Sequence, residues 1–558
     1  MTQRPFIQFN NFTFRYDSQS EPTLHDINLT IYEHEKVLIL GQSGSGKSTL
    51  MHCMNGLIPF SYKGEIQGEC LIMNQPSTSL SLFKIGKKLG SILQDSDAQF
   101  VSLSVGEDVA FVLENQNMPR ELMIEKVIEA TSKVHMSDFL TQVPFQLSGG
   151  QKQKVALAGV LHDDVVGLLF DEPLASLDPV SAAEAINLID ELHQQQKTMI
   201  IIEHRFEDVI LKAVDRVIVM HEGRIVFDGG VDELLKSSLC GRYGLREPLY
   251  LQALKTFNVS LNQHESWTPL ENMKIPAFDL PALKLESTQP QGTEVCRFDH
   301  VYFQYDERPL IQDVSFKVYK GERIALMGEN GAGKSTLAKL LSGIVSPYSG
   351  VVSVLNQPTS AMSIAQIGQH IGLVMQNPNQ MIAKQSVEEE ILFALRLRLQ
   401  DEALISERLI EVLTMTDLKS MRRWPVSALS YGQKKRLTVA AILALSPDIL
   451  ILDEPTAGQD YAHYTEMMSF LEHLHKLTQL AFIFITHDMH LAMEYTDRAL
   501  VLSKGQLIYD GPTYIALSDA SLMKQASLRP TSLLELAIKS GHDPATLAYH
   551  FIKEFKHG

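Results

Sequence analysis

The sequence predicts an α/β protein built from two tandem copies of one domain. The first observation is an apolar run, Val37–Leu40, followed by a glycine-rich loop, Gly41–Gly46, and by residues that can form a helix. The second is that the same arrangement returns over Ile324–Gly333. The third is a set of further shared motifs, each displaced by 282 or 283 positions (for example 430 − 148 = 282). A spacing that stays constant across independent motifs indicates an internal duplication.

Both glycine-rich loops fit the pattern Gly-x-x-x-x-Gly-Lys-Ser, in which backbone N–H groups cradle phosphates. Lys47 can reach the outer phosphates and the Ser48 hydroxyl can bind Mg²⁺; Lys334 and Ser335 repeat them 287 positions later (334 − 47 = 287). A chance Gly/Ser-rich turn would lack the flanking strand and helix. The candidate phosphate-binding residues are Gly41, Ser43, Gly44, Gly46, Lys47, Ser48 and Thr49 in the first copy and Gly328, Asn330, Gly331, Gly333, Lys334, Ser335 and Thr336 in the second.

Composition narrows the functional class. The 558 residues are 45% hydrophobic and 21% charged, as in ordinary globular proteins, and the net charge of −17 argues against general binding of nucleic acid. The N-terminus has no signal-peptide core, and no apolar run approaches the roughly 20 residues that span a bilayer. Any membrane role is therefore expected to come through a partner. The four cysteines form no Cys-x-x-Cys pair, which favours free thiols in a reducing cytosol over a zinc or redox site.

Two predicted strands end in a pair of acids. Asp171 and Glu172 follow one apolar run, and Asp453 and Glu454 follow its counterpart. The carboxyl ends of parallel strands form the ligand-binding edge of such sheets. Here the aspartates could hold Mg²⁺, and the glutamates could polarise a water for attack on phosphorus. Two solvated acids that open a loop are a credible alternative for one copy and a poor one for two.

Other predicted strands end in an amide or an imidazole. Gln94 and Gln376 can offer a carbonyl oxygen to Mg²⁺ or to the attacking water, although each alone could be a plain polar residue. His204 and His487 follow apolar strands in the same register, which favours a contact with the γ-phosphate over a structural histidine.

A second anion site is expected where a helix begins. Ser148 and Gly150 open the helix after Leu147, and Ser430 and Gly432 repeat them. A serine N-cap with glycine N–H groups at a helix N-terminus suits an anion, although a capped helix with no further role explains the same residues. The repeat places Tyr431 where the first copy has glycine.

Outside these motifs, the sequence predicts three further features. A helical insert interrupts each α/β core, near 105–145 and again from Val387. Tyr16 and Tyr305 occupy equivalent strands, and their recurrence favours stacking on a nucleotide base over an ordinary strand tyrosine. The stretch 240–293 is Pro-rich, without a sustained period, and predicts a linker.

The motifs, in this order and twice over, resemble the ATP-binding cassette (ABC) ATPases. The resemblance implies two tandem P-loop NTPase domains, each with a RecA-like core, an antiparallel β subdomain and a helical insert. It places domain 1 at 1–239, the linker at 240–293, domain 2 at 294–525 and a helical tail at 526–558. The motifs described above then take the roles known in this family. The glutamines Gln94 and Gln376 match the Q-loop, the serine-capped helix starts match the signature, and Ser176–Asp178 and Gly458–Asp460 match the D-loop. The glutamates, histidines and tyrosines match the catalytic glutamate, the switch histidine and the tyrosine that stacks on adenine. ATP and Mg²⁺ are the implied cofactors.

In this family cassettes pair head to tail. The resemblance therefore implies that Lys47 shares one ATP with Ser430 and Gly432, and that Lys334 shares another with Ser148 and Gly150. Because both glutamates and both histidines are present, we expect two hydrolytic sites. The site of Lys47 is the unusual one, because the signature assigned to it has Tyr431 in place of glycine.

Stretches near Gln94–Phe100, Glu107–Asn115 and Gln376–Gln380 are similar to the ATPases of energy-coupling-factor importers, which take up vitamins, precursors such as that of thiamine, and metal ions. This resemblance implies a transmembrane coupling subunit and a substrate-binding membrane protein as partners, no nucleic acid, and a place on the cytoplasmic face of the membrane. Two alternatives remain: a soluble tandem cassette that acts on ribosomes, disfavoured by the Pro-rich linker and acidic charge, and the ATPase of an exporter.

Overall fold

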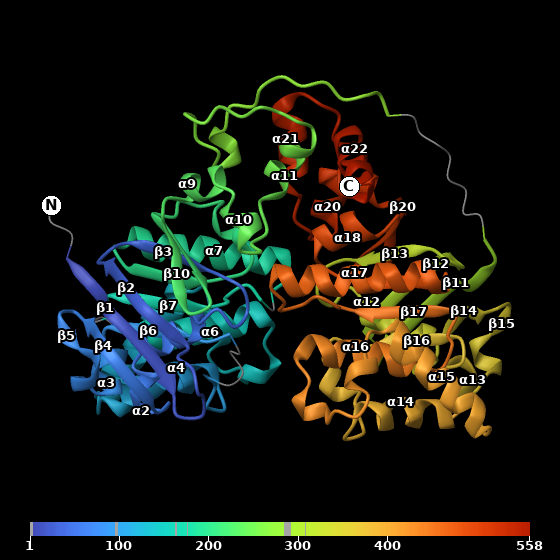
Figure 1. Ribbon diagram of the computed structural model, residues 1–558, viewed down its shortest axis with the longest axis horizontal. Coiled ribbons are helices and arrows are strands. Elements are labelled where there is room, and N and C mark those ends of the chain that lie inside the picture. Colours follow the sequence, from blue (N-terminus) through green and yellow to red (C-terminus); the bar gives the residue numbers. More distant parts are fainter. Residues whose placement is uncertain are drawn as a thin grey trace. The chain divides into compact units, whose positions relative to one another are not determined.

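The computed structural model describes residues 4–94, 99–161, 165–175, 177–283, 292–306 and 308–557 (Figure 1). The chain divides into two compact units. The first comprises residues 1–251, 261–274 and 458–462, and the second comprises residues 252–260, 275–457 and 463–558. Each unit is described by itself.

The first unit holds two sheets. A four-stranded antiparallel sheet has the order β2-β1-β4-β5, and a six-stranded sheet has the order β10-β9-β3-β8-β7-β6. Its elements are β1 (Pro5–Tyr16), β2 (Leu24–Tyr32), β3 (Lys36–Leu40), α1 (Lys47–Met54), α2 (Leu57–Phe60), β4 (Gly64–Ile72), β5 (Gln75–Pro76), α3 (Leu82–Gly86), β6 (Leu89–Ile92), α4 (Val105–Asn115), α5 (Arg120–Lys133), α6 (Gly149–Val160), β7 (Gly167–Asp171), α7 (Pro179–Gln194), β8 (Thr198–Ile202), α8 (Phe206–Val209), β9 (Arg216–His221), β10 (Arg224–Gly229), α9 (Val231–Lys236) and α10 (Leu239–Arg242).

The second unit repeats both sheets, with the orders β12-β11-β14-β15 and β16-β17-β18-β13-β19-β20. Helix α11 (Leu249–Thr256) lies on the boundary between the two units. The remaining elements are β11 (Glu294–Tyr305), β12 (Arg308–Tyr319), β13 (Arg323–Met327), α12 (Lys334–Leu341), β14 (Ser349–Val354), β15 (Gln357–Pro358), α13 (Ile364–Ile367), β16 (Ile371–Val374), α14 (Val387–Arg396), α15 (Glu402–Met415), α16 (Tyr431–Leu443), β17 (Ile449–Asp453), α17 (Tyr461–Thr478), β18 (Ala481–Ile485), α18 (Met489–Tyr495), β19 (Arg498–Ser503), β20 (Gln506–Pro512), α19 (Thr513–Ala516), α20 (Ala520–Gln525), α21 (Ser532–Ser540) and α22 (Pro544–His557).

The strand order explains how distant motifs meet. In the first unit β3, β8, β7 and β6 are neighbours and run parallel, so their carboxyl ends lie along one edge. Strands β13, β18, β17 and β16 do the same in the second unit. The phosphate loop, the histidine, the acids and the glutamine each follow one of these four strands. The predicted α/β core, antiparallel sheet and helical insert are therefore present in both units.

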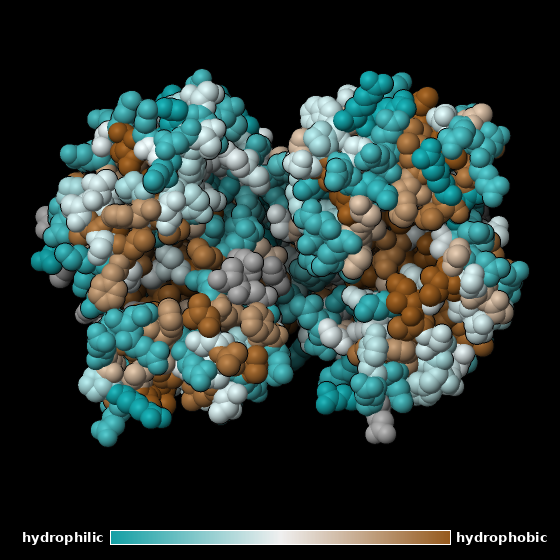
Figure 2. Space-filling view, turned by 90° about the horizontal axis from the view of Figure 1, so that it is seen from below, coloured by the Kyte–Doolittle hydropathy of each residue, from teal (hydrophilic) through white to brown (hydrophobic). Residues whose placement is uncertain are grey.

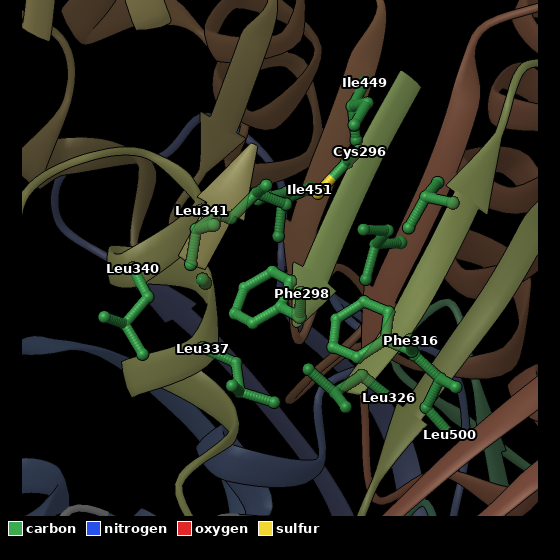
Figure 3. Close-up of a cluster of buried hydrophobic side chains, with 14 of the residues drawn as sticks. Cys296, Phe298, Phe316, Leu326, Leu337, Leu340, Leu341, Ile449, Ile451 and Leu500 are labelled. Carbon is green, nitrogen blue, oxygen red and sulfur yellow. The ribbon is translucent and has the colours of Figure 1, made fainter. Parts of the chain in front are cut away.

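The apolar side chains of the strands are buried in a cluster between the sheets of each unit, and the helical insert of the second unit has an apolar cluster of its own. In the second unit the rings of Phe298 and Phe316 stack with centroids 4.5 Å apart, among leucines of α12 and isoleucines of β17 (Figure 3). The core beneath the first phosphate loop contains Phe6, Phe14 and Met51. Each core fixes the start of a helix against a sheet edge, which holds the site rigid.

The stretch expected to be a Pro-rich linker carries regular structure. Helices α10 and α11 fall within or beside it, and the Trp267 side chain is buried. The Tyr250 hydroxyl donates to the Trp267 carbonyl at 2.7 Å, and the Trp267 N–H donates to Asp232 at 2.9 Å. The helices are short, four and eight residues, so they leave no sustained period in the sequence.

Helix α21 confirms that residues around Leu533 form a helix, and it packs on α22. Within the described ranges no helix combines the length and the apolar character needed to cross a bilayer.

Candidate functional site

The first phosphate loop joins β3 to α1. Gly41 has φ +153°, and a Cβ atom there would lie 2.4 Å from the Met220 carbonyl oxygen, so only glycine fits. The buried Lys47 ammonium donates 2.8 Å hydrogen bonds to the carbonyls of Gly41 and Gln42. Burial lowers the pKa of Lys47. The Ser48 hydroxyl group belongs to an exposed residue at the start of α1.

The second phosphate loop has the same geometry between β13 and α12. A Cβ atom on Gly328, φ +150°, would lie 2.3 Å from the Leu502 carbonyl oxygen. Lys334 donates to the carbonyls of Gly328 and Glu329 at 2.8 and 2.9 Å, and Ser335 is exposed. The other predicted loop residues lie in these two turns: Ser43, Gly44, Gly46 and Thr49 in the first, and Asn330, Gly331, Gly333 and Thr336 in the second.

The predicted catalytic residues of the first unit, Glu172 and His204, follow β7 and β8. Glu172 Oε1 is 2.8 Å from His204 Nε2, and its Oε2 accepts a 2.6 Å hydrogen bond from Gln94 Nε2. Burial, then the neighbouring Glu172 charge, raises the pKa of Asp171 to about 6. Gln94 and His204, which the sequence predicts separately, thus both contact the Glu172 carboxylate.

In the second unit Glu454 Oε1 is 2.6 Å from Nδ1 of His487. Burial, then the Glu454 charge, raises the pKa of Asp453 to about 6. Both glutamates adopt left-handed backbone conformations, with φ +48° at Glu172 and +46° at Glu454. The two units therefore share the carboxylate–imidazole contact.

Magnesium fits the oxygen donors at this edge. Ser48 offers a hydroxyl and Asp171 a carboxylate, and the Gln94 amide nitrogen faces Glu172. Among the described residues no group of three or more His, Cys, Asp or Glu side chains could enclose a metal. Mg²⁺ suits such an open site because it keeps waters and binds through one or two carboxylates plus substrate phosphates.

The predicted serine caps are confirmed. Ser148 Oγ accepts from the Gln151 N–H at 3.3 Å, and the Gln151 side chain accepts from the Ser148 N–H at 2.9 Å. Ser430 and Gln433 form the same capping box at the start of α16, with distances of 3.2 and 2.9 Å. Gly150 and Gly432 lie in the first turns of α6 and α16.

Tyr431 makes contacts that the sequence does not suggest. Its hydroxyl donates to the main-chain carbonyl of Gln376 at 3.2 Å, which links the start of α16, the predicted signature, to the predicted Q-loop within the second unit. The Lys435 ammonium lies 5.3 Å from the centre of the Tyr431 ring and donates to the carbonyls of Glu454 and Pro455. Burial lowers the pKa of Lys435 to about 8.

The predicted base-stacking tyrosines differ in setting. Tyr16 is half-buried: its hydroxyl lies 3.1 Å from Thr49 Oγ1, and its ring is perpendicular to that of Tyr62 at 6.2 Å. Tyr305 is more open and touches Phe303 edge to face. Stacking on adenine stays a prediction for both.

One buried polar residue was not predicted from the sequence. Glu203 ends the apolar run of β8, and its carboxylate accepts from the N–H groups of Leu174, His204 and Arg205 at 2.8–3.1 Å. It fixes the histidine loop to the loop after Glu172. An acid directly before His204 was the available signal. Ser176 of the predicted D-loop and residues 95–98 of the predicted importer motif lie outside the described residues.

Comparison with known proteins agrees with this geometry. A family profile described as ABC transporter matches residues 24–175 and 311–457, more than half of the chain. A second profile, described as ATP-binding cassette cobalt transporter, matches residues 237–295.

Several curated relatives match almost end to end. A putative ABC transporter ATP-binding protein of Streptococcus mutans is 46% identical over 99% of both chains, and one of Enterococcus faecalis is 48% identical over 96% of this chain and 95% of its own. A solved structure of cbiO1 from Clostridium perfringens, described as part of the ABC transporter complex cbiONQ, is 29% identical, covers 44% of this chain and 99% of that chain, and has a TM-score of 0.40. The chain belongs to the ABC transporter family, as an ATP-binding protein with two cassettes whose hydrolysis of ATP drives transport.

Proposed function

We propose that this ATPase drives an importer of the energy-coupling-factor type, for a vitamin, a vitamin precursor or a metal ion. The observation that carries the proposal is the match of residues 237–295 to a profile described as ATP-binding cassette cobalt transporter. The importer-like stretches around Gln376–Gln380 and Glu107–Asn115 support it. The partners are then a transmembrane coupling subunit and a substrate-binding membrane protein, with the ATPase on the cytoplasmic face of the membrane.

The helical inserts are the proposed docking surfaces for the coupling subunit. In the view of Figure 2, each unit shows patches of hydrophobic residues with hydrophilic residues around them. In the second unit, the exposed apolar residue Phe393 lies on α14, Leu397 directly follows that helix, and Trp424 lies beyond α15. In the first unit, Leu103 and Phe111 lie before and on α4. Apolar patches rimmed by polar residues are typical of protein interfaces.

We further propose how the residues divide the chemistry. The N–H groups and the lysine of each phosphate loop would hold the phosphates of ATP. In the first cassette Ser48, Asp171 and Gln94 would hold Mg²⁺ through their oxygen atoms. Glu172 then accepts a proton from the attacking water while His204 holds the carboxylate in place. Bound Mg²⁺ supplies charge that neutralises the phosphate oxygens. The matching set in the second cassette is Ser335, Gln376, Asp453, Glu454 and His487.

Each ATP is proposed to be shared with the signature of the other cassette. The prediction is that Ser430→Ala slows ATP turnover in a Glu454→Gln chain, where only the first site hydrolyses, and leaves turnover in a Glu172→Gln chain unchanged. Ser148→Ala should show the opposite pattern. If both serines affect the site of their own cassette, the head-to-tail arrangement is wrong. If one glutamate variant keeps full turnover, the corresponding site does not hydrolyse ATP.

The importer proposal is tested by purifying the tagged protein from gently solubilised membranes and identifying what accompanies it. A polytopic coupling subunit with a substrate-binding membrane protein supports the proposal. Ribosomal subunits, or the absence of any membrane protein, overturn the proposal. An exporter subunit also overturns it and favours the alternative that this chain is the ATPase of an exporter. Leu397→Asp on the insert should release the partner, whereas Ile538→Asp on α21, equally exposed at 67%, should not.

A further inference from the structure

A buried lysine joins the helix that begins at the second predicted signature to the backbone of Glu454. Lys435 lies on α16 and is 3% exposed. Its ammonium donates to the main-chain carbonyl of Glu454 at 3.3 Å and to that of Pro455 at 2.5 Å. Both acceptors are main-chain atoms, which cannot turn away as the end of a flexible side chain could. The lysine therefore fastens the chain that leaves β17 to α16.

The backbone of Glu454 needs such contacts. Its φ of +46° is a left-handed conformation, which a residue with a side chain keeps only where the surrounding structure imposes it. The Glu454 N–H donates to the Ile485 carbonyl at 2.9 Å, and its carbonyl also accepts from the Ala457 N–H at 3.2 Å. These partners belong to the neighbouring strand and to the same loop. Lys435 adds a contact from the signature helix.

The first cassette has a donor at the equivalent position. Gln153 lies on α6, 282 positions before Lys435 (435 − 153 = 282), and donates to the Pro173 carbonyl at 2.7 Å. Pro173 directly follows Glu172, as Pro455 follows Glu454. Both cassettes thus bond the proline after the glutamate to the signature helix, although the donor is an amide in one and an ammonium in the other. The lysine alone also reaches the carbonyl of the glutamate itself.

A second side chain of α16 extends the connection. The centre of the Tyr431 ring lies 5.3 Å from the Lys435 ammonium, and a cation over an aromatic ring is attracted to its face. The Tyr431 hydroxyl donates to the Gln376 carbonyl. The start of one helix therefore bonds to the backbone of the predicted Q-loop and to the backbone of Glu454, all within the second unit.

We propose that Lys435 is a positioning residue for ATP hydrolysis at the second site, where it holds the backbone of Glu454 so that the carboxylate meets the attacking water. Gln153 has the corresponding role for Glu172. This inference rests on the proposed function of the two glutamates in activating water, and it does not depend on what is transported. Because neither Glu454 nor Pro455 is a predicted ligand of ATP or magnesium, replacing Lys435 should change kcat and not KM.

The test is steady-state hydrolysis of ATP with magnesium by the full chain carrying Glu172→Gln, in which the second site supplies turnover. Lys435→Met removes the ammonium and keeps a long side chain. It should lower kcat about tenfold, because small displacements of positioned groups are costly, and should change KM by less than about twofold. Lys435→Gln should restore kcat to within about threefold of the parent, because glutamine at this position bonds the proline carbonyl in the first cassette.

Two further variants separate positioning from folding. Arg398→Met is the matched control, because Arg398 also donates to a main-chain carbonyl of the second unit, that of Gly368 at 3.2 Å. Gly368 precedes β16, whereas the site follows the carboxyl ends of the strands, so kcat should not change. Gln153→Met in the Glu454→Gln chain repeats the test in the first cassette and should lower kcat about threefold, since one neutral hydrogen bond is lost. It serves as the test where Lys435→Met does not fold, which the unfolding temperature shows.

The inference is overturned by an unchanged kcat in Lys435→Met, by a change in KM alone, or by an equal loss of kcat in Arg398→Met. Failure of Lys435→Gln to recover kcat also contradicts it. The chain carrying both Glu172→Gln and Glu454→Gln separates this outcome from failure of the proposed function. If that chain still hydrolyses ATP, the proposed role of the glutamates is wrong, and the inference with it. If it does not, and Lys435→Met has the kcat of the parent, only the inference is wrong.

Discussion

Tyr431 distinguishes the two signature motifs, and its removal gives the most informative prediction about the known reaction. In Tyr431→Phe the ring and its contact with Lys435 remain, and only the hydroxyl that donates to the Gln376 carbonyl is lost. A neutral hydrogen bond of this kind contributes about 0.5–1.5 kcal/mol. Because Tyr431 is 44% exposed and the bond is 3.2 Å long, the lower half of that range applies, about 0.5–1 kcal/mol. We therefore expect a loss of about two- to fivefold in kcat/KM at the second site, where Gln376 is the proposed magnesium or water ligand.

The assay is steady-state ATP hydrolysis in the Glu172→Gln chain, in which the second site supplies turnover. The matched control is Tyr509→Phe, which removes a hydroxyl that donates to a carbonyl, that of Pro512 at 3.0 Å, in the edge strand β20. The control should leave kcat/KM unchanged. The reasoning is refuted if Tyr431→Phe has no effect there, or if it acts only in the Glu454→Gln chain.

Three other predictions concern stability and binding. Phe298→Ala should lower the free energy of unfolding of the second unit by about 3–5 kcal/mol in denaturant titrations, while Ile364→Ala, 65% exposed, should change it by less than about 0.5 kcal/mol. Asp453→Asn should raise the free energy of unfolding by about 1–2 kcal/mol at pH 7.5 without nucleotide or magnesium. The folded Asp453 carboxyl, whose pKa is about 6, holds its proton more tightly than the unfolded one, so the stability of the parent falls as the pH rises from about 4 to 6. The stabilisation by Asp453→Asn should therefore vanish below about pH 4. A stabilisation that persists at about pH 3.5 contradicts this cause. Gly328→Ala should abolish ATP binding at the second site of a Lys47→Ala chain, because its Cβ atom would lie 2.3 Å from a main-chain oxygen; retained affinity would show that β19 can move aside.

Much of the site could be predicted because its parts are short and local. Gly41, Asp171 and His204 each follow an apolar strand, and a parallel sheet brings the ends of such strands together. Because the domain is duplicated, each motif occurs twice at a nearly constant offset, which argues against a chance match to the pattern. The serine caps depend on residues three positions apart, so they too are visible in the sequence.

The features that could not be predicted from the sequence depend on contacts between residues that are distant along the chain. Gly244 lies beside the end of the Gln42 side chain although the two are 202 residues apart (244 − 42 = 202), and no local pattern marks this proximity. The described residues 240–283 of the 240–293 stretch are held by short helices and by scattered buried side chains such as Trp267 and Leu249, which leave no periodicity. The link from Tyr431 to the Gln376 carbonyl uses a main-chain atom, to which the residue type at 376 gives no clue.

The left-handed backbone of Glu172 and Glu454 has a consequence for how such duplicated motors diverge. A non-glycine residue in this conformation carries a conformational cost of about 1 kcal/mol or more, which asparagine or glycine would reduce. In the proposed mechanism the carboxylate at these positions is needed for the attack of water, and this need opposes the conformational preference of the chain. Once a cassette no longer needs to cleave ATP, drift toward asparagine or glycine at this position would stabilise the fold. In a relative with one cassette that does not hydrolyse ATP, the residue at this position should thus identify the cassette that has lost hydrolysis.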